Sequence, residues 1–375
     1  MADGTNPVLM LDLGPLHASM RAELDAAIRT VLDRGQFVLG EEVAAFEREA
    51  AAWLGVRHAV AVASGTDALL LALKAAGIGH GDEVITTGFT FFATVEAIRL
   101  AEATPVFADI DPETLTLDAG DARKCITPRT RAILPVHLFG HVADMNAILA
   151  LADEHAMIVI EDAAQAFGAR RDGQAAGSFG LAGAFSFHPT KPLGALGDGG
   201  LVATGDDNIA AEVRLLRNHG ASAHHRHERI GCNSRLDELQ AAVLRVKLRH
   251  LERHLAARER IASIYDTLLR DLPLQLPARE PAVRSSHAQY TLQSPQRDVL
   301  KQALDDAGIA CAIHYPEPAW RQPALRPIPH DPGLPITETA CRNCLSLPLY
   351  EGLLPAQQER IAAIIRRLAR ASRVS

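Results

Sequence analysis

One lysine of this 375-residue chain stands in a setting that suits lysine chemistry. Lys191 lies between a Ser-Phe-His-Pro-Thr run and a glycine-rich loop, and its neighbours are small, apolar or turn-forming. A lysine removed from water has a lowered pKa and is a nucleophile that forms Schiff bases. The alternative is a solvated surface charge, which we expect for Lys74, Lys247 and Lys301 because they lie on amphipathic helical patterns. The apolar setting of Lys191 favours the chemical role.

A carboxylate at the end of a predicted buried strand is the second candidate. The apolar run 157–160 ends in Glu161 and Asp162. A buried carboxylate needs a partner, and one suitable partner is the protonated pyridine nitrogen of pyridoxal phosphate (PLP). The alternative is an ordinary cap on the next helix. Gln165, three residues on, lies on the same helical side as Asp162 and is placed to reach the same ligand.

The third candidate is a turn of small residues. Ser64-Gly65-Thr66-Asp67 follows a strand-like run and opens a helical pattern. Such a turn offers backbone N–H groups and the positive end of the helix dipole to a phosphate. Alone it is a weak signal, since Ser and Thr are also ordinary helix caps. Together with Lys191 and Asp162 it completes the set that a PLP site needs.

These residues must be positioned by an alternation of helices and strands, and that alternation runs through the first two-thirds of the chain. Helices are expected over 68–76, 94–100 and 143–155, and strands over 83–86, 105–110, 132–137 and 157–160. The pattern predicts an α/β fold with a mostly parallel central sheet covered by helices. Ligands of such sheets bind beyond the carboxyl ends of the strands, where Asp162 is expected.

The alternating pattern of helices and strands ends after residue 233. Apolar residues keep a helical period from Leu236 to Leu255, which predicts a long helix that bridges two domains or lies in a dimer interface. The segment 272–284, which contains Pro and Arg, leads to a smaller unit with strand, helix and strand character. We therefore expect a large domain over 1–250 and a smaller α/β C-terminal domain over 251–375.

Composition excludes several classes of function. Lys and Arg number 38 and Asp and Glu 45, so the net charge is −7, and we expect no nucleic-acid partner. No window approaches the roughly 20 apolar residues that span a bilayer, and no secretion signal follows Met1. Five cysteines are too few and odd in number for a disulfide framework. The protein is therefore expected to be cytoplasmic, without a membrane partner.

Two local patterns suggest metal binding and are set aside. Cys341 and Cys344 have CxxC spacing, but no second pair accompanies them and the segment is predicted to be a helix that leads into residues 345–348. The run His224–His227 lies in a polar stretch just before Asn233, where a flexible loop is placed to contact the phosphates of a ligand. We expect no metal site.

The motifs, in this order and spacing, resemble those of the DegT/DnrJ/EryC1/StrS family of sugar aminotransferases, which are PLP enzymes of fold type I. The likeness covers nearly the whole chain. Its segments are SGTDAL at 64–69, GDEVITTGFTFFAT at 81–94, ATPVFADID at 103–111, VHLFG at 136–140, EDAAQAFGA at 161–169, FSFHPTKPLGALGDGG at 185–200, CNSRLDELQAA at 232–242 and HYPEP at 314–318.

The resemblance implies roles on the cofactor. Lys191 matches the lysine that links to PLP and moves the proton, Asp162 the partner of the pyridine nitrogen, and Gln165 the contact to the ring oxygen O3′. The phosphate ligands that the motifs imply are Gly65, Thr66 and Ser186. Pro192 departs from the family pattern, which often has Asn after the lysine.

The resemblance also implies residues at the edge of the site. Phe91 falls where an aromatic ring stacks on the cofactor. Asn233 matches a phosphate ligand from the neighbouring subunit of a homodimer with shared active sites, and Arg235 belongs to the same motif. His314 and Tyr315 match a segment that lines the substrate side.

The implied reaction is transfer of an amino group from an amino acid, expected to be L-glutamate, to a keto sugar linked to a nucleotide. The motif NSRLDELQAA at 233–242 is more similar to that of family members that aminate C3 of a 3-keto sugar than to that of members that act at C4. A dehydratase branch of the family carries histidine in place of the lysine, so Lys191 favours transamination. A non-enzymatic alternative is a regulatory protein that binds PLP without turnover.

Overall fold

A computed structural model describes residues 7–325 and 332–371 of the chain. The strands are β1 (His58–Val62), β2 (Glu83–Thr87), β3 (Thr104–Ala108), β4 (Thr130–Ile133), β5 (Ile158–Asp162), β6 (Arg170–Arg171), β7 (Gln174–Ala175), β8 (Ala182–Ser186), β9 (Gly200–Thr204), β10 (Ala221–Ala223), β11 (Arg226–His227), β12 (Val283–Arg284), β13 (Tyr290–Gln293) and β14 (Cys344–Leu347). The α-helices are α1 (Gly14–Ala18), α2 (Arg21–Arg34), α3 (Glu41–Leu54), α4 (Gly65–Ala75), α5 (Phe92–Leu100), α6 (Ala119–Lys124), α7 (Met145–Glu154), α8 (Asp207–Leu216), α9 (Glu238–Arg249), α10 (Leu251–Leu269), α11 (Arg297–Asp306), α12 (Pro335–Asn343) and α13 (Pro355–Ala371).

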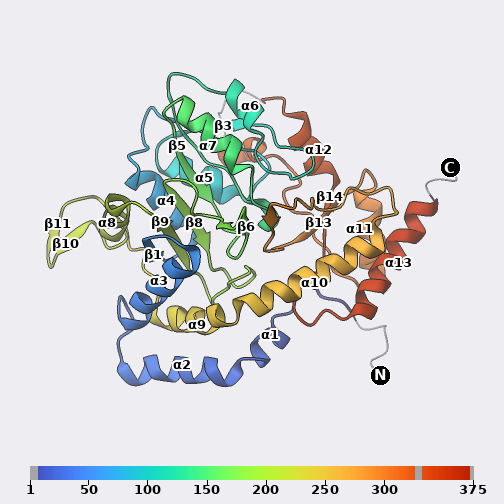
Figure 1. Cartoon of the computed structure of the whole chain (residues 1–375), viewed down its shortest axis with the longest axis horizontal. Coiled ribbons are helices and arrows are strands. Elements are labelled where there is room, and N and C mark those ends of the chain that lie inside the picture. Colours follow the sequence, from blue (N-terminus) through green and yellow to red (C-terminus); the bar gives the residue numbers. More distant parts are fainter. Residues whose placement is uncertain (1–6, 326–331, 372–375) are drawn as a thin grey trace.

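A seven-stranded sheet in the order β1-β9-β8-β5-β4-β2-β3 forms the centre of the molecule (Figure 1). β9 pairs antiparallel with β1 and β8, whereas the pairs from β8 to β3 are all parallel. This confirms the expected α/β class with a mostly parallel sheet. Pro105, which has no N–H to donate, lies on the edge strand β3, where a proline is tolerated.

Helices cover both faces of this sheet, and the two faces have separate apolar cores. On β1, Val60 and Val62 contribute to the core beneath α4, α5 and α8. Ala59 and Ala61, which alternate with them, face the core beneath α3, α7 and α9. The alternation of side chains along a strand therefore feeds both layers. The carboxyl ends of the parallel strands remain free for a site.

The expected strand over 132–137 is shorter than predicted. β4 ends at Ile133, and Pro135, two residues on, has no N–H for the ladder. The chain nevertheless continues beside β5, because the His137 N–H donates to the Asp162 carbonyl at 3.0 Å and the Asp162 N–H donates to the Pro135 carbonyl at 2.9 Å. The segment after β4 thus stays paired with the end of β5.

The single long helix expected from the 236–255 pattern is two helices that meet at His250. Its apolar residues do not face a partner subunit, because Leu236, Val243, Val246 and Leu255 are each at most 3% exposed within one chain. Val243 and Val246 pack against α2, and Leu236 and Leu255 belong to the core beneath α3 and α9. The hypothesis that this stripe lies in a dimer interface is therefore wrong.

A smaller layer follows α10, which runs from the central sheet toward α13 (Figure 1). Its core joins α10, α11, α13 and the antiparallel pair β13–β14. Val8 from the N-terminal segment is buried in the same core and bridges to Ile309. β12, in contrast, pairs with β6 of the large unit. Contacts therefore cross the expected boundary near residue 250, and the division into domains over 1–250 and 251–375 stays a prediction.

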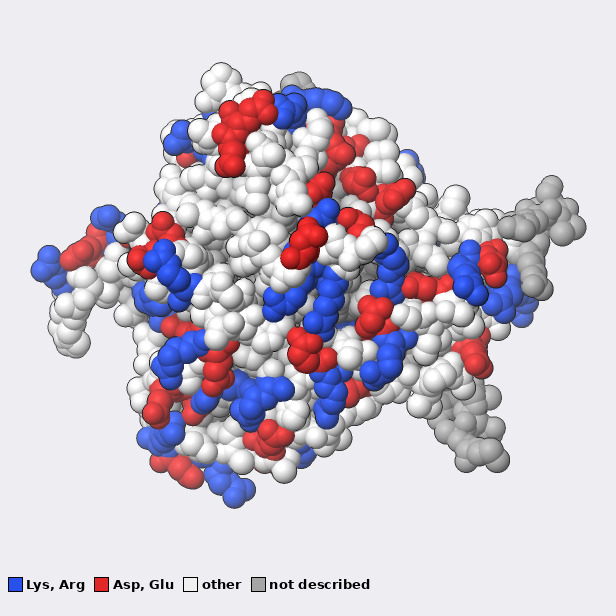
Figure 2. Space-filling model, in the orientation of Figure 1, with Lys and Arg blue, Asp and Glu red and all other residues white. Residues whose placement is uncertain are grey.

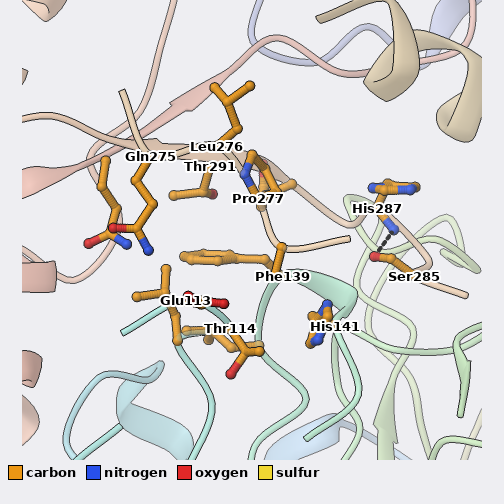
Figure 3. Close-up of a pocket in the computed structure, with 15 residues that line it drawn as sticks. Glu113, Thr114, Phe139, His141, Gln275, Leu276, Pro277, Ser285, His287 and Thr291 are labelled. Atoms are coloured by element: carbon orange, nitrogen blue, oxygen red, sulfur yellow. Dashed lines mark hydrogen bonds between the residues drawn. The ribbon is translucent and has the colours of Figure 1, made fainter. Parts of the chain in front are cut away.

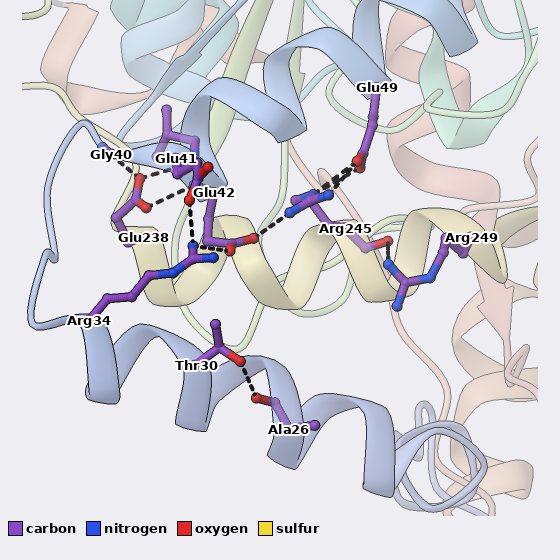
Figure 4. Close-up of polar contacts among 11 residues, drawn as sticks. Ala26, Thr30, Arg34, Gly40, Glu41, Glu42, Glu49, Glu238, Arg245 and Arg249 are labelled. Atoms are coloured by element: carbon purple, nitrogen blue, oxygen red, sulfur yellow. Dashed lines mark hydrogen bonds and ion pairs between the residues drawn. The ribbon is translucent and has the colours of Figure 1, made fainter.

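α9 is fixed to α3 by charged side chains on one of its faces (Figure 4). The Glu238 carboxylate accepts hydrogen bonds from the backbone N–H groups of Gly40, Glu42 and Val43 at 2.8, 2.9 and 3.0 Å. These groups start α3, where N–H donors lack partners within the helix and an anion is favoured. Arg245, seven residues after Glu238, donates to Glu49 at 2.7 Å. The two helices are therefore joined along two turns.

Acidic and basic side chains are interspersed on the face shown in Figure 2. Many form ion pairs between different elements, such as Arg249 of α9 with Glu23 of α2 at 3.0 Å and Arg284 of β12 with Glu252 of α10 at 2.6 Å. Among the described residues, no helix is long and apolar enough to cross a membrane.

Replacing Glu238 by alanine should destabilise the protein by about 3 kcal/mol, because three N–H groups at the start of α3 lose a charged acceptor. Urea unfolding followed by circular dichroism measures the change. Glu252→Ala is the matched control, since Glu252 is 60% exposed and its ion pair should contribute less than about 1 kcal/mol. Equal effects of the two substitutions would contradict the assignment.

Candidate active site

Asp162 is buried at the carboxyl end of β5, where the sequence predicted it. Its Oδ2 accepts a hydrogen bond from the Thr94 hydroxyl at 2.7 Å, and its Oδ1 accepts one from the Ala164 N–H at 3.1 Å. Burial raises the pKa of Asp162, while these donors and nearby Lys191 oppose the shift. Thr94 was not singled out from the sequence, although it ends the quoted motif 81–94. The carboxylate is thus held in one orientation by two donors.

Lys191 lies in the loop between β8 and β9, on the same edge of the sheet as Asp162. Burial lowers the pKa of the Lys191 amine, and the charge of Asp162 opposes this shift. A neutral amine is the nucleophilic form, so this environment favours the chemistry expected of Lys191. The structure therefore brings together the two residues on which the sequence interpretation depends.

Gly65, Thr66 and Ser186 also lie together. Gly65 and Thr66 are the first residues of α4, so their backbone N–H groups have no acceptor within the helix. A Cβ at Gly65 would lie 2.6 Å from the Ser186 Cβ, which shows how closely the end of β8 approaches α4. A Cβ at Gly200 would lie 2.1 Å from the Ser64 carbonyl oxygen. Glycine is thus required at both positions, and the result is a cradle of donors suited to a phosphate.

Gln165 connects the loop after β5 to the C-terminal part of the chain. Its Oε1 accepts from the Phe139 N–H at 2.6 Å, and its Nε2 donates to the Tyr315 hydroxyl at 2.9 Å. The Tyr315 ring stacks on Phe139 with centroids 6.2 Å apart and meets Phe89 edge-on at 5.6 Å. Phe139 and Tyr315 both adopt a positive φ, 55° in each case. The surrounding contacts hold this uncommon conformation in place.

His314 lies beside this aromatic group, with its ring 6.0 Å from that of Phe139. Burial, together with the charge of Lys191, lowers the pKa of His314. Its buried Nε2 has no hydrogen-bond partner among the described residues. A buried ring nitrogen without a partner indicates a position where a ligand supplies one.

The small cavity next to Phe139 is not this site (Figure 3). It measures about 40 Å³ and is lined by residues such as Glu113, His141, Gln275 and Ser285, without Lys191 or Asp162. That volume holds one or two water molecules but no cofactor. Phe139 lines this cavity and also stacks on Tyr315, which does not line it.

A buried pair of an acid and a histidine, Glu161 and His137, lies next to Asp162 in the fold. This pair was not singled out from the sequence. His137 and Glu161 are both fully buried, and their side chains meet at 2.8 Å. The His137 Nδ1 accepts from the Ala143 N–H, so its Nε2 carries the proton that is donated to Glu161. Glu161 also accepts from the N–H groups of residues 177, 179 and 180. The position of Glu161 directly before Asp162 was the sequence feature that could have indicated this pair.

The structure leaves two of the expected site residues on the surface. The Phe91 side chain is 60% exposed at the start of α5. Asn233 is also exposed, and its side chain makes no hydrogen bond within the described chain. Its neighbour Ser234 accepts from the Ala63 N–H and donates to Asp67 of α4. Arg235 donates to the Asn218 side chain at 3.1 Å.

The His224–His227 run belongs to the β10–β11 hairpin, which projects from the body of the molecule (Figure 1). Its residues are exposed. Cys341 is in α12 and Cys344 begins β14, and burial raises the pKa of both thiols to about 12. Within 7–325 and 332–371 no group of three His, Cys, Asp or Glu side chains is arranged to hold a metal ion.

The profile of the DegT/DnrJ/EryC1/StrS aminotransferase family matches residues 18–366. A UDP-N-acetyl-3-dehydro-alpha-D-glucosamine 3-aminotransferase of Acidithiobacillus ferrooxidans is 46% identical and aligns over 96% of this chain and 97% of its own. A pleiotropic regulatory protein of Geobacillus stearothermophilus is 42% identical over 96% and 100% of the two chains. The chain therefore belongs to this aminotransferase family.

Solved structures agree with the assignment. The structure of S. venezuelae DesV superimposes with a TM-score of 0.95 at 45% identity, covering 97% of this chain and 99% of that one. The structure of NtdA from Bacillus subtilis, solved with bound cofactor PMP, gives a TM-score of 0.88 at 28% identity over 94% and 82%. These likenesses confirm the expected fold type I and the PLP-dependent class of aminotransferase.

Replacing Thr94 by valine should move the acidic limb of the pH profile of kcat/KM upward by about 1 to 2 pH units. The hydroxyl stabilises the charged form of Asp162, so its loss raises the pKa of that carboxyl by the value of one hydrogen bond to a charge. Thr90→Val is the matched control. Thr94 donates its proton to Asp162 and only accepts from Thr90, so that bond survives the control. An unmoved limb in Thr94→Val would contradict the role.

Proposed function

We propose that this member of the DegT/DnrJ/EryC1/StrS aminotransferase family transfers an amino group from L-glutamate to C3 of a nucleotide-linked 3-keto sugar. The observation that carries the proposal is the meeting of Lys191, Asp162 and the Gly65–Ser186 cradle at one edge of the sheet. An amine, a carboxylate and a set of phosphate donors are the groups that PLP requires of a protein.

The residues present fit this cofactor. The Gly65 and Thr66 N–H groups and Ser186 would hold its phosphate, Asp162 its ring nitrogen and Gln165 its ring oxygen. The Phe91 ring is exposed and free to lie against its face. When bound, PLP supplies an electron sink for the electrons released at the carbon that carries the amino group.

The chain's own groups then have distinct tasks. Asp162, held by Thr94 and Ala164, would place a negative charge beside the ring nitrogen and so favour its protonated form. Lys191 would hold the cofactor through its Nζ, and its neutral amine would accept the proton from the amino-acid α-carbon. The same amine later returns a proton to the sugar carbon. The lowered pKa of Lys191 favours the neutral amine that this proton transfer needs.

The substrate class is supported by the names of several relatives. Three that are 41 to 46% identical are named as aminotransferases or transaminases of a 3-dehydro, 3-oxo or 3-amino sugar linked to UDP or dTDP. These names favour amination at C3. Retention of Lys191 disfavours a dehydratase, and a turnover assay separates the enzyme from a regulatory protein.

We also propose a homodimer with shared active sites, in which Asn233 and Arg235 act on the partner's ligands. The Asn233 side chain is exposed and makes no hydrogen bond within the described chain, as that of a residue that serves another subunit would be. Exposed apolar side chains lie on segments that contact residues 237–240, since Val38 bridges to Asp237 and the Leu196 N–H donates to Gln240, and burying them between two copies would stabilise a dimer. They are Phe37, Val38, Leu39 and Leu196, and Ile230, close to Asn233 in the sequence, is 95% exposed. His224–His227 on the projecting hairpin are placed to meet the sugar-nucleotide phosphates.

Incubation of the purified protein with PLP, L-glutamate and a UDP- or dTDP-linked 3-keto sugar should yield 2-oxoglutarate and a 3-amino sugar nucleotide, detected by mass spectrometry. Lys191→Ala should lose activity by at least about 1,000-fold, because the proton then has no carrier. Borohydride reduction of the wild-type protein should attach the cofactor to the peptide that contains Lys191. Lys74→Ala, on exposed α4 surface, is the control. Attachment at another lysine, or product formation without glutamate consumption, would refute the proposal.

Mixing inactive Lys191→Ala with inactive Asn233→Asp should restore up to about a quarter of wild-type activity after subunit exchange. One site of each heterodimer then receives both wild-type residues, and half of the dimers are heterodimers. Lys191→Ala mixed with Asp162→Asn is the control, because both defects act on the same chain's site and no site is repaired. If Asn233 acts within its own chain, the first mixture stays as inactive as the control.

A further inference from the structure

The loop that carries Lys191, residues 187–197, is held only in part by its own backbone. The Lys191 N–H donates to the His188 carbonyl at 2.9 Å, and the Ala195 N–H donates to the Phe187 carbonyl at 2.7 Å. These bonds close two turns inside the loop. Leu193 and Ala195 are buried in the core beneath α9. Apart from contacts among residues 186–199 themselves, two side chains of α9 bind the loop backbone.

Gln240 and Lys247 supply these contacts. The Gln240 Oε1 accepts from the Leu196 N–H at 2.8 Å. The Lys247 Nζ donates to the Gly194 carbonyl at 2.7 Å and to the His17 Nε2 at 3.1 Å. Both contacts fall within five residues of Lys191, on the chain that leads away from it.

Gly194 also packs against the half of the loop that precedes Lys191. A Cβ at Gly194 would lie 2.5 Å from the Pro189 carbonyl oxygen and 3.0 Å from that of His188. The Cα of Gly194 therefore rests directly on the backbone that precedes Lys191. Because Lys247 binds the carbonyl of the same glycine, movement of either side of the turn has to break that contact.

Lys247 is a costly residue to bury. It is 3% exposed, and within the described chain it forms no ion pair with a carboxylate. Burial lowers the pKa of its amine to about 8. A buried amine without a counter-charge destabilises the fold, so its presence calls for a contact that offsets the cost. The Gly194 carbonyl is the shortest contact it makes. The expectation that Lys247 is a solvated surface charge is therefore wrong.

The two opposite faces of α9 bind different parts of the chain. Glu238 and Arg245 are seven residues apart and bind α3 (Figure 4), whereas Gln240 and Lys247 are also seven apart and bind the loop. Residues seven apart share a face of a helix, and a shift of two residues turns the helix by about 200°. α9 is thus fixed to α3 on one side and holds the loop on the other.

We propose that Gln240 and Lys247 are positioning residues, which fix the 187–197 loop so that the Lys191 side chain alone moves between its partners. The role of Lys191 rests on the proposed function, whereas the ordering of the loop does not. The two statements are therefore tested by different measurements.

The first measurement is hydrogen exchange by mass spectrometry on the purified protein. Lys247→Met keeps the length of the side chain but removes its N–H donors. We expect the amides of 190–197 to exchange at least about 10-fold faster, while those of β5 stay unchanged. Lys74→Met, on the exposed face of α4, should leave the loop as in the wild type. Unchanged exchange of the loop in Lys247→Met overturns the proposal.

A pair of variants at Gln240 keeps the test decisive if the Lys247→Met variant does not fold. Gln240→Leu removes the acceptor of the Leu196 N–H, whereas Gln240→Glu retains an oxygen there. Faster loop exchange in Gln240→Leu that Gln240→Glu restores supports the proposal. Equal exchange in the two variants overturns it.

The second measurement is steady-state transamination. Looser loops should lower kcat by about 10-fold and leave the KM for the sugar nucleotide within about twofold, because the loop carries Lys191 and not the binding groups. Faster exchange with unchanged kcat overturns the positioning role. If the wild-type protein catalyses no transamination, the proposed function fails instead, and loop exchange alone decides whether α9 orders the loop.

Discussion

Burial of an amine beside a carboxylate is the constraint on which the site depends. Removal from water shifts the pKa of Asp162 up and that of Lys191 down, so that both groups tend toward their neutral forms. Their mutual attraction opposes this tendency but does not fix geometry. Thr94 and the Ala164 N–H restore the charged form of Asp162 with directed hydrogen bonds. Among the described residues the Lys191 amine has no comparable hydrogen-bond partner, so it remains available to react.

The fold meets this constraint with a rigid frame behind the carboxylate. Asp162 ends a strand whose preceding residue, Glu161, points to the opposite face and satisfies four donors. Three of these donors belong to the turn before β8, and the fourth belongs to the segment after β4. One buried carboxylate therefore ties β5 to both neighbouring strands. Because Asp162 directly follows Glu161 on β5, these contacts of Glu161 also fix the position of the Asp162 carboxylate.

Residue patterns predicted the parts of this arrangement that depend on local sequence. The strand that ends at Asp162, the turn that opens α4 and the glycine-rich setting of Lys191 each carry a signal within a few residues. The contacts across the chain carry none, because Thr94, His137 and Gln165 find their partners 24 to 150 residues away. The apolar period of 236–255 indicated a buried helical face but not its partner, which is α2 and α3 of the same chain. For the same reason an amphipathic pattern made Lys247 look exposed, although α1 and the loop cover it.

A transaminase must let one lysine exchange partners while everything else in the site stays in place. A long side chain on a fixed backbone achieves this, since four rotatable carbons allow Nζ to move without moving Cα. A mobile loop would add backbone freedom, and the entropy of that freedom would have to be removed in each proton transfer. The structure places small or rigid residues around Lys191, namely Pro189, Pro192 and Gly194, and closes the turn against α9. The stiffness of the loop and the flexibility of its lysine are therefore complementary requirements of the same reaction.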